Sequence, residues 1–289
     1  MSDQTTVAVL GAGGTMGRPM ARNLAQAGLD VRAWNRSPEK ARPLESDGVQ
    51  LLDSPAAAAQ GADIVVTMLA DTDAVLESVS PALGAAGADV LWLQMSTVGE
   101  EGIERCLALA RERGVGILDA PVLGTKQPAE DGALVVLASG ARELCERAQP
   151  VFDAVGSKTI WVGEAGAGTR LKLVANSWVL TVVEGTAETI ALAEGLGVDP
   201  QLFFDTIEGG ALDLPYLRLK GKAILAREFE PSFSLRLAAK DARLVHQAAR
   251  ARELELPLFA AIAQRMTEGS ENHGEKDMSA TYLTAARGQ

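Results

Sequence analysis

Short apolar runs alternate with segments of helical spacing through the first half of the chain, and this alternation constrains the fold more than any other feature. In the helical segments the apolar residues recur every three or four positions. Strands separated by helices pair in parallel, because each helix returns the chain to the same edge of the sheet. The predicted strands cover residues 7–10, 31–34, 64–69, 90–93, 116–122, 133–138 and 159–162. The pattern therefore predicts an α/β domain with a doubly wound, mostly parallel sheet.

The first predicted strand ends in a glycine-rich turn, GAGGTMG at residues 11–17. Glycines between a strand and a helix let the backbone approach a pyrophosphate, which the free amides of the helix N-terminus attract. The spacing departs from Gly-x-Gly-x-x-Gly, because the third glycine counted from Gly11 comes one residue late, at Gly17, while counting from Ala12 puts alanine first. The predicted cofactor contacts in this turn are Gly11, Gly13, Gly14, Thr15 and Met16.

The end of the second predicted strand bears on the choice of cofactor. In a dinucleotide-binding domain this position meets the adenosine ribose, where an acidic residue suits a 2′-hydroxyl and an arginine suits a 2′-phosphate. The residues here are Asn35, Arg36 and Ser37, and Asp30 lies at the opposite end of the strand. We therefore predict that these three residues bind the cofactor and that NADP(H) is preferred to NAD(H). The alternative is that Arg36 is an ordinary solvated residue.

Two further strand ends are predicted to contact the cofactor. Ligands of doubly wound sheets bind past the carboxyl ends of the strands. Met68 and Leu69 end one predicted strand, and Thr97 follows the next. The alternative for the second position is that Ser96 or Thr97 caps the following helix.

Beyond residue 163 the alternation stops, and the remaining segments have helical spacing. They cover residues 169–196, 200–208, 214–226, 235–252 and 257–268, which predicts a dinucleotide-binding domain at 1–163 and an all-helical domain at 164–289. At about 1.5 Å per residue the first of these helices approaches 40 Å. A helix of this length can reach a partner subunit, so a homodimer or homotetramer is expected. Lys172 and Asn176 lie one turn apart near its start.

Charge and composition limit the classes of molecule that the protein is expected to bind. The formal net charge of -11 disfavours nucleic acid, whose phosphates attract basic surfaces. No apolar run approaches the roughly 18 residues that a membrane span needs, and the N-terminus lacks the features of a signal peptide. A cytoplasmic protein with a small-molecule substrate and no membrane contact is expected. The two histidines, His246 and His273, have no metal-ligand spacing around them, so no metal site is expected.

Several motifs recur in an order that resembles one enzyme family. They are the glycine turn with Met20-Ala21-Arg22-Asn23-Leu24, then Ser96-Thr97-Val98, then Asp119-Ala120-Pro121-Val122 with Gly132-Ala133-Leu134, then Gly166-x-Gly168-x-x-x-Lys172-x-x-x-Asn176, and finally Lys240-Asp241. Together they resemble the β-hydroxyacid dehydrogenases, the family of 3-hydroxyisobutyrate dehydrogenase, tartronate semialdehyde reductase and the plant glyoxylate/succinic semialdehyde reductases. The resemblance spans nearly the full length.

The resemblance implies a Rossmann domain joined to an all-helical domain, with the active site in the cleft between them. It implies that Lys172 is the general acid/base, that Asn176 helps to hold the substrate, that Lys240 lies near the cofactor and that Thr97 lies by the nicotinamide. Without the resemblance, Lys240 and Asp241 could be an ordinary solvated pair. Asn-Arg-Ser at residues 35–37 and Lys126-x-Pro128-Ala129-Glu130 are similar to the NADP-preferring semialdehyde reductases.

The predicted substrate loop departs from the family pattern. After the valine the family usually has Ser-Gly-Gly or Ser-Gly-Ser, whereas this chain has Leu123, Gly124 and Thr125. Loss of the serine hydroxyl removes a donor expected to bind a substrate carboxylate, although Gly124 and Thr125 still offer donors. The predicted substrate-binding residues are these three with Lys172 and Asn176.

These residues favour an NADP(H)-dependent oxidoreductase that interconverts a small aldehyde or keto acid and its hydroxy acid. Hydride transfer needs a proton donor for the oxygen that gains charge, and Lys172 can supply that proton. An imine reductase is the nearest alternative, since that class shares the architecture and the Asn-Arg edge, but it generally replaces the lysine. A cofactor-binding protein without turnover is the alternative from another class.

Overall fold

The computed structural model describes residues 4–285 of the chain, which divides into two compact units, Met1–Lys172 and Leu173–Gln289. The division falls inside the long helix α8 (Ala167–Gly195). The predicted boundary between residues 163 and 164 lies just before this helix.

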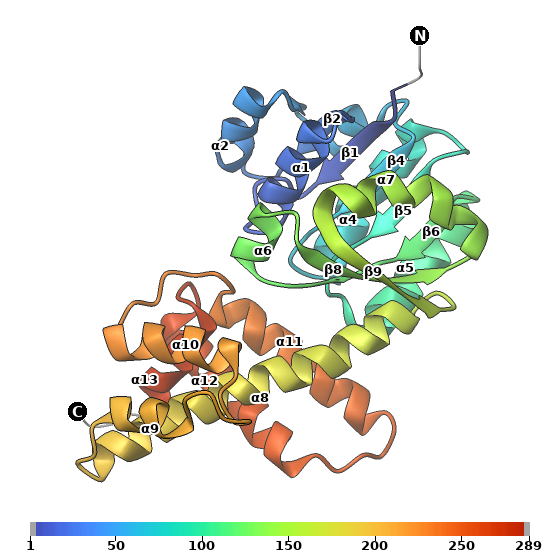
Figure 1. Ribbon diagram of the computed structural model, residues 1–289. Coiled ribbons are helices and arrows are strands. Elements are labelled where there is room, and N and C mark those ends of the chain that lie inside the picture. Colours follow the sequence, from blue (N-terminus) through green and yellow to red (C-terminus); the bar gives the residue numbers. More distant parts are fainter. Residues whose placement is uncertain (1–3, 286–289) are drawn as a thin grey trace. The chain divides into compact units, whose positions relative to one another are not determined.

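The first unit is built on one nine-stranded sheet (Figure 1). Its strands are β1 (Thr6–Leu10), β2 (Asp30–Trp34), β3 (Gln50–Leu51), β4 (Ile64–Thr67), β5 (Leu91–Gln94), β6 (Gly116–Asp119), β7 (Val122–Leu123), β8 (Leu134–Gly140) and β9 (Gly156–Gly163). They lie in the order β3-β2-β1-β4-β5-β6-β8-β7, with β9 paired to β8. Pairing is parallel from β3 to β6, and β8 is antiparallel to β6 and β7. The predicted doubly wound, mostly parallel sheet is confirmed.

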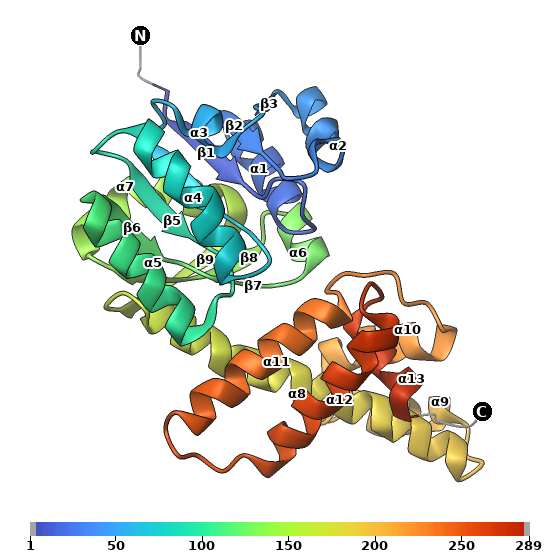
Figure 2. The same cartoon turned by 180° about the vertical axis from the view of Figure 1, so that it is seen from behind.

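Helices cover both faces of the sheet because successive side chains of a strand point to opposite faces. Val7 and Val9 of β1 belong to the core beneath α1 (Gly17–Gln26) and α7 (Cys145–Val155). Ala8 and Leu10 belong to the core beneath α3 (Pro55–Ala59), α4 (Thr72–Ala86) and α5 (Gly99–Arg113). Figures 1 and 2 show the two layers from opposite sides. Burial on both faces explains why the strands are continuously apolar in sequence. The short helix α2 (Pro38–Ala41) and a 3-10 turn (Arg42–Asp47) connect β2 to β3.

One part of the prediction for this unit is wrong. The single strand predicted at 116–122 is two strands, β6 and β7, interrupted at Ala120 and Pro121. Proline has no N–H to donate to a sheet ladder, so the pairing of β6 ends before it. The segment predicted as a loop after Val122 contains the last residue of β7 and the five-residue helix α6 (Lys126–Glu130).

The second unit contains no strand among its described residues, and its helices pack on α8. They are α9 (Pro200–Ile207), α10 (Pro215–Ala226), α11 (Leu235–Arg250), α12 (Pro257–His273) and α13 (Tyr282–Ala285), with a 3-10 turn at Met278–Thr281. The main core joins α8, α11 and α12 through residues such as Leu180, Ala238 and Met266. The predicted all-helical domain is confirmed, although α12 continues beyond its predicted end at residue 268.

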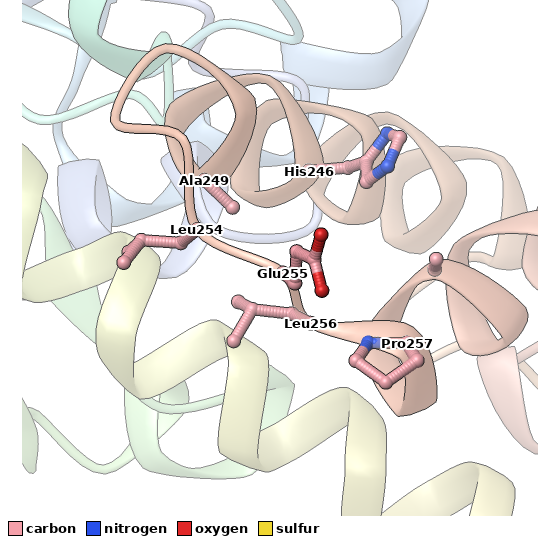
Figure 3. A pocket seen from close by; sticks show the side chains of 7 residues that line it. His246, Ala249, Leu254, Glu255, Leu256 and Pro257 are labelled. Carbon is pink, nitrogen blue, oxygen red and sulfur yellow. The ribbon is translucent and has the colours of Figure 1, made fainter.

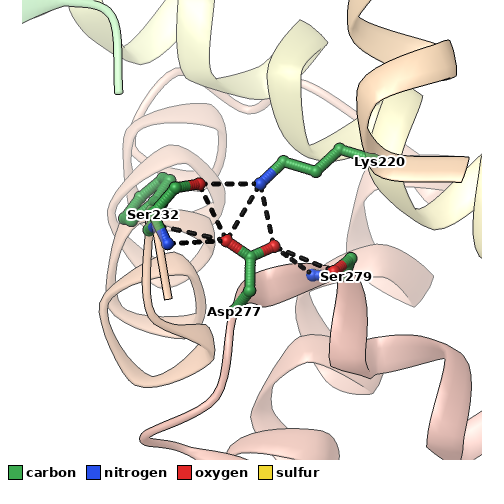
Figure 4. Close-up of polar contacts among 5 residues, drawn as sticks. Lys220, Ser232, Asp277 and Ser279 are labelled. Atoms are coloured by element: carbon green, nitrogen blue, oxygen red, sulfur yellow. Dashed lines mark hydrogen bonds and ion pairs between the residues drawn. The ribbon is translucent and has the colours of Figure 1, made fainter. Parts of the chain in front are cut away.

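A buried ion pair ties the C-terminal segment of this unit to α10. Lys220 Nζ lies 2.8 Å from Asp277 Oδ1, and each residue is 3% exposed (Figure 4). Asp277 also accepts hydrogen bonds from the hydroxyl groups of Ser232 and Ser279. Burial opposes ionisation of Asp277. The Lys220 charge, together with hydrogen bonds from Lys220, the Ser279 amide and the Ser232 hydroxyl, nevertheless lowers the pKa of Asp277. The carboxylate is therefore fully partnered within the helical unit.

Candidate functional site

The glycines of the turn after β1 have distinct structural roles. A Cβ at Gly11 would lie 2.2 Å from the Met68 carbonyl oxygen, and the φ of Gly11 is +96°. A Cβ at Gly17 would lie 2.2 Å from the Gly11 carbonyl oxygen. These two glycines therefore permit close packing of the turn against β4 and of α1 against the turn. At Gly14 the nearest atom to a Cβ is 3.4 Å away, so the protein itself leaves room beside this residue.

The start of α1 has the features of an anion site. The helix has no side-chain N-cap and no acidic residue in its first turn. Within residues 4–285, the backbone amides of Thr15 and Met16 have no hydrogen-bond acceptor. Unpaired amides at a helix N-terminus bind phosphate, so the residues present fit the pyrophosphate of a dinucleotide.

Asn35 holds the glycine turn from the end of β2. Its side-chain oxygen accepts a hydrogen bond of 3.0 Å from the Gly13 amide, and its side-chain nitrogen donates one of 2.8 Å to the Ser37 carbonyl. A Cβ at Gly13 would lie 2.5 Å from that nitrogen, which explains a glycine here. Arg36 is exposed, and within the described part of the chain its guanidinium has no hydrogen-bond or ion-pair partner. Asn35 thus shapes the turn, while Arg36 is available to a ligand.

A buried polar network fixes the ends of β4 and β5. The Ser96 hydroxyl accepts a 2.9 Å hydrogen bond from the Leu69 amide and donates one of 3.1 Å to the Thr67 carbonyl. The Gln94 side chain accepts a hydrogen bond from the Ser96 amide and donates one to the Ser96 carbonyl, and the Trp92 indole donates one to the Thr67 hydroxyl. The Ser96 hydroxyl is thus used at the ends of β4 and β5 and not as a cap of α5, whose N-cap residue is Val98.

The first turn of α8 is bonded to the sheet of the first unit. Asp119, at the end of β6, accepts 2.8 Å hydrogen bonds from both the amide and the hydroxyl of Thr169. Ser139 of β8 accepts a 2.9 Å hydrogen bond from the Gly168 amide. Asp119 is fully buried, and this desolvation raises its pKa although the bonds from Thr169 oppose the rise. Lys172, one turn further along the helix, is also buried.

In the second unit, Asn176 and Lys240 are joined through Asp241. Asn176 Nδ2 donates a 2.7 Å hydrogen bond to Asp241 Oδ2, and Lys240 Nζ lies 2.9 Å from Asp241 Oδ1. The alternative that Lys240 and Asp241 form a solvated pair is wrong, because Asp241 is 3% exposed. The buried carboxylate orients the amide of Asn176.

The predicted substrate loop leads from β7 into α6. Leu123 pairs with Val135 in the sheet and is half-buried. Gly124 has a φ of +140°, and a Cβ there would lie 2.6 Å from a Leu134 methyl carbon, so no larger residue fits without strain. Thr125 is the N-cap of α6, but its hydroxyl makes no capping bond.

A cavity of about 310 Å³ lies elsewhere in the second unit, where α11 ends and α12 begins (Figure 3). It is lined by His246, Ala249, Leu254, Glu255, Leu256, Pro257 and Ala260. None of the predicted site residues lines it.

Asp119, Asp241 and the Ser96 network were missed as positioning groups. A signal existed for each, since a polar residue in an apolar strand or on an apolar helix face needs a buried partner. The identity of that partner could not be read from the sequence, because Asp119 bonds Thr169 and Asp241 bonds Asn176 across many intervening residues.

Comparisons with known proteins identify relatives of both units. Residues 6–163 match the model of the NAD-binding domain of 6-phosphogluconate dehydrogenase, and residues 166–284 match the NAD-binding region of NADP-dependent 3-hydroxyisobutyrate dehydrogenase. Glyoxylate/succinic semialdehyde reductase 2 of Arabidopsis thaliana is 32% identical over 95% of this chain and 78% of its own.

Solved structures extend the comparison. The 3-hydroxyisobutyrate dehydrogenase of Mycobacterium tuberculosis, solved with L-serine, is 32% identical, with a TM-score of 0.87 over 97% of this chain and 99% of its own. An imine reductase of Myxococcus stipitatus in complex with NADP+ is 21% identical, with a TM-score of 0.66 over 96% and 99%, and shares the fold. From its matched domains and its relatives, this chain is a member of the β-hydroxyacid dehydrogenase family of NAD(P)-dependent oxidoreductases.

Proposed function

We propose that the chain is an NADP(H)-dependent oxidoreductase that interconverts a small aldehyde or keto acid and the corresponding hydroxy acid, with Lys172 as general acid/base. One observation supports this most: Lys172 and Asn176 are both buried, one turn apart in α8, and Asn176 is held by the buried Asp241. A lysine that served only for solubility would not be buried.

The two side chains divide the chemistry. The nicotinamide, when bound, supplies or accepts the hydride. Lys172 gives a proton to the carbonyl oxygen as it gains charge, and takes it back in the reverse direction. Asn176 donates one N–H to Asp241, which leaves its second N–H and its oxygen for the substrate.

The preference for NADP(H) is proposed from Arg36. Its exposed guanidinium follows β2 without a protein partner in residues 4–285, and no acidic residue stands there to bind a 2′-hydroxyl. Arg36→Ala should weaken NADPH binding roughly tenfold or more, as expected for loss of a charge-assisted phosphate contact, and leave NADH binding within about twofold. Fluorescence titration of both cofactors measures this, and equal losses would contradict the 2′-phosphate assignment.

The substrate class is proposed from Lys172 and from the loop that starts at Leu123. Leu123 offers no hydroxyl to a substrate carboxylate, but Thr125 retains one that is not used for capping, beside the backbone amide of Gly124. Small aldehydes and keto acids remain compatible with these donors. An imine reductase is the second candidate, which the apolar Leu123 favours and the retained Lys172 disfavours.

Turnover decides between these functions. We expect NADPH oxidation with at least one of succinic semialdehyde, glyoxylate, methylmalonate semialdehyde and larger aldehydes, and none with cyclic imines. Lys172→Ala should lower kcat by about 10²- to 10⁴-fold, the usual range for a general acid, with the NADPH Kd nearly unchanged. Turnover of cyclic imines alone would favour the second candidate. Inactivity toward the whole panel with intact NADPH binding would favour a binding protein without turnover.

Self-association is proposed from the surface of α8. The side chains of Val174, Trp178, Leu192 and Leu196 are between 62% and 70% exposed. Val174, Trp178 and Leu192 lie along one side of α8, and Leu196 directly follows the end of the helix. Exposed apolar surface of this kind marks an interaction site. We propose a homodimer or homotetramer, and Trp178→Glu should shift the mass measured by light scattering toward the monomer.

Residence in the cytoplasm is proposed from the sequence, and cell fractionation tests it. In residues 4–285, none of the helices combines the length and the apolar character of a membrane span.

A further inference from the structure

Helices α1 and α6 lie side by side in the first unit, as both views show (Figures 1 and 2). Two side chains of α1 bond the end of α6. Asn23 Nδ2 donates a 2.9 Å hydrogen bond to the Ala129 carbonyl, and Arg22 donates one of 3.3 Å to the Glu130 carbonyl. Asn23 is only 8% exposed. Side chains of α1 therefore add to the backbone bonds that cap the C-terminus of α6.

This cap matters because α6 cannot hold its own position. A five-residue helix is far below the length at which helices are stable alone. Its last carbonyls accept amides from the turn that follows it, and the bonds from α1 are its side-chain ties to another element. In the turn after α6, Gly132 has a φ of +64°. A Cβ built at this glycine would lie 3.6 Å from the Asn23 side-chain nitrogen. Asn23 thus bonds the end of α6 and lies beside the turn that follows it.

The two helices begin at the two ligand-binding segments. The N-terminus of α1 adjoins the glycine turn, and the N-cap of α6 is Thr125, the last residue of the substrate loop. Pro128 of α6 packs against Gly124, where a built Cβ would lie 3.2 Å from it. A displacement of α6 would therefore move Gly124 and Thr125 relative to the turn that binds the cofactor phosphates.

We propose that Asn23, with Arg22, is a positioning residue that sets the substrate loop at a fixed distance from the cofactor turn. This inference rests on the proposed function, since it takes residues 123–125 as the substrate loop. It assigns to these two side chains an effect on the carbonyl substrate that is separate from cofactor binding.

The test compares Asn23→Ala and Arg22→Ala with Arg113→Ala. Arg113 is a matched control, because its guanidinium donates a 3.2 Å hydrogen bond to the Ser80 carbonyl between α5 and α4. Loss of the buried bond in Asn23→Ala should raise the KM for the carbonyl substrate roughly tenfold, and Arg22→Ala roughly threefold. The NADPH Kd should stay within about twofold in all three variants.

Hydrogen exchange gives a readout that needs no turnover. The amides of Ala129, Asp131 and Ala133 bond within the α6 segment, so they should exchange faster in Asn23→Ala and Arg22→Ala and at the wild-type rate in Arg113→Ala.

If Asn23→Ala does not fold, Arg22→Ala alone tests the inference. Unchanged exchange in the variants that fold would overturn the inference whatever the enzyme does. Faster exchange with unchanged KM would also overturn it, and so would parallel losses of substrate and cofactor binding. A wild type inert toward every carbonyl would instead overturn the proposed function, and faster exchange would still establish the tie between the helices.

Discussion

Replacement of Asp119 by alanine tests how the start of α8 is held. The carboxylate is fully buried and accepts both the amide and the hydroxyl of Thr169, itself 2% exposed. Water cannot reach either donor after the substitution, so each stays unsatisfied at a cost of about 1–3 kcal/mol. Part of this cost is offset, because the mutant no longer buries the Asp119 carboxyl group, whose pKa is raised by desolvation. We expect a net loss of about 3 kcal/mol in the free energy of unfolding of the first unit.

The assay must report on the first unit alone. Of the four tryptophans, Trp178 is the one in the second unit, and phenylalanine keeps an apolar aromatic side chain at this exposed position. In a Trp178→Phe background, fluorescence during urea unfolding follows the first unit. Asp63→Ala is the matched control, because this carboxylate accepts the Thr6 amide at the same 2.8 Å but is exposed. Solvent replaces that bond, so the control should lose less than about 1 kcal/mol.

A double-mutant cycle separates the bond from general damage. Thr169→Val removes the hydroxyl donor and should cost about 1 kcal/mol in the wild-type background. In the Asp119→Ala background that donor has already lost its acceptor, so we expect a coupling energy of about 1 kcal/mol. Additivity of the two substitutions within about 0.3 kcal/mol would refute the bonding scheme, as would an Asp119→Ala cost no greater than that of Asp63→Ala.

Two further predictions concern the second unit. Asp241→Asn should reduce kcat/KM by roughly tenfold or more, because Asn176 and Lys240 lose their shared carboxylate. The unfolding midpoint of this variant should stay close to that of the wild type. Wild-type kinetics would show that the carboxylate does not orient Asn176. Lys220→Met should destabilise the unit by about 3–5 kcal/mol at neutral pH, since it leaves the buried Asp277 unpaired. Because the folded pKa of Asp277 is lowered, this difference should persist above the ordinary Asp pKa of about 3.9 and shrink as the pH falls through the lower folded value. A difference independent of pH in urea titrations would exclude the ion pair as its source.

The fold could be predicted because its signals are local and repeated. Continuous apolar strands such as β4 show burial on both faces, and glycine turns mark where strands pass into helices. The error at β7 and α6 has a physical cause. Both elements are very short, and they form because β7 pairs with β8 and the side chains of Arg22 and Asn23 hold α6. Such contacts are distant in sequence and leave no periodic pattern.

The glycine turn shows the same limit at the level of single residues. The sequence alone could not rank its four glycines, because the extra residue allows more than one alignment with the usual motif. Atomic contacts do rank them. Gly11 and Gly17 meet backbone oxygens, Gly13 meets the Asn35 side chain, and Gly14 meets little. The Asn35 side chain thus has two effects on Gly13. It accepts the hydrogen bond from the Gly13 amide, and it lies so close that only glycine fits at this position.

The polar groups around α8 follow one rule. A buried charge or amide costs stability unless it is bonded, so each persists only with a partner. Asp119 bonds the first turn of α8 in one unit, and Asp241 bonds Asn176 in the other. Lys172 lies in the helix between these two anchors. The helical repeat aligns Lys172 and Asn176 with each other, but it does not fix their helix to the fold around it. The two buried carboxylates supply that attachment, one in each unit.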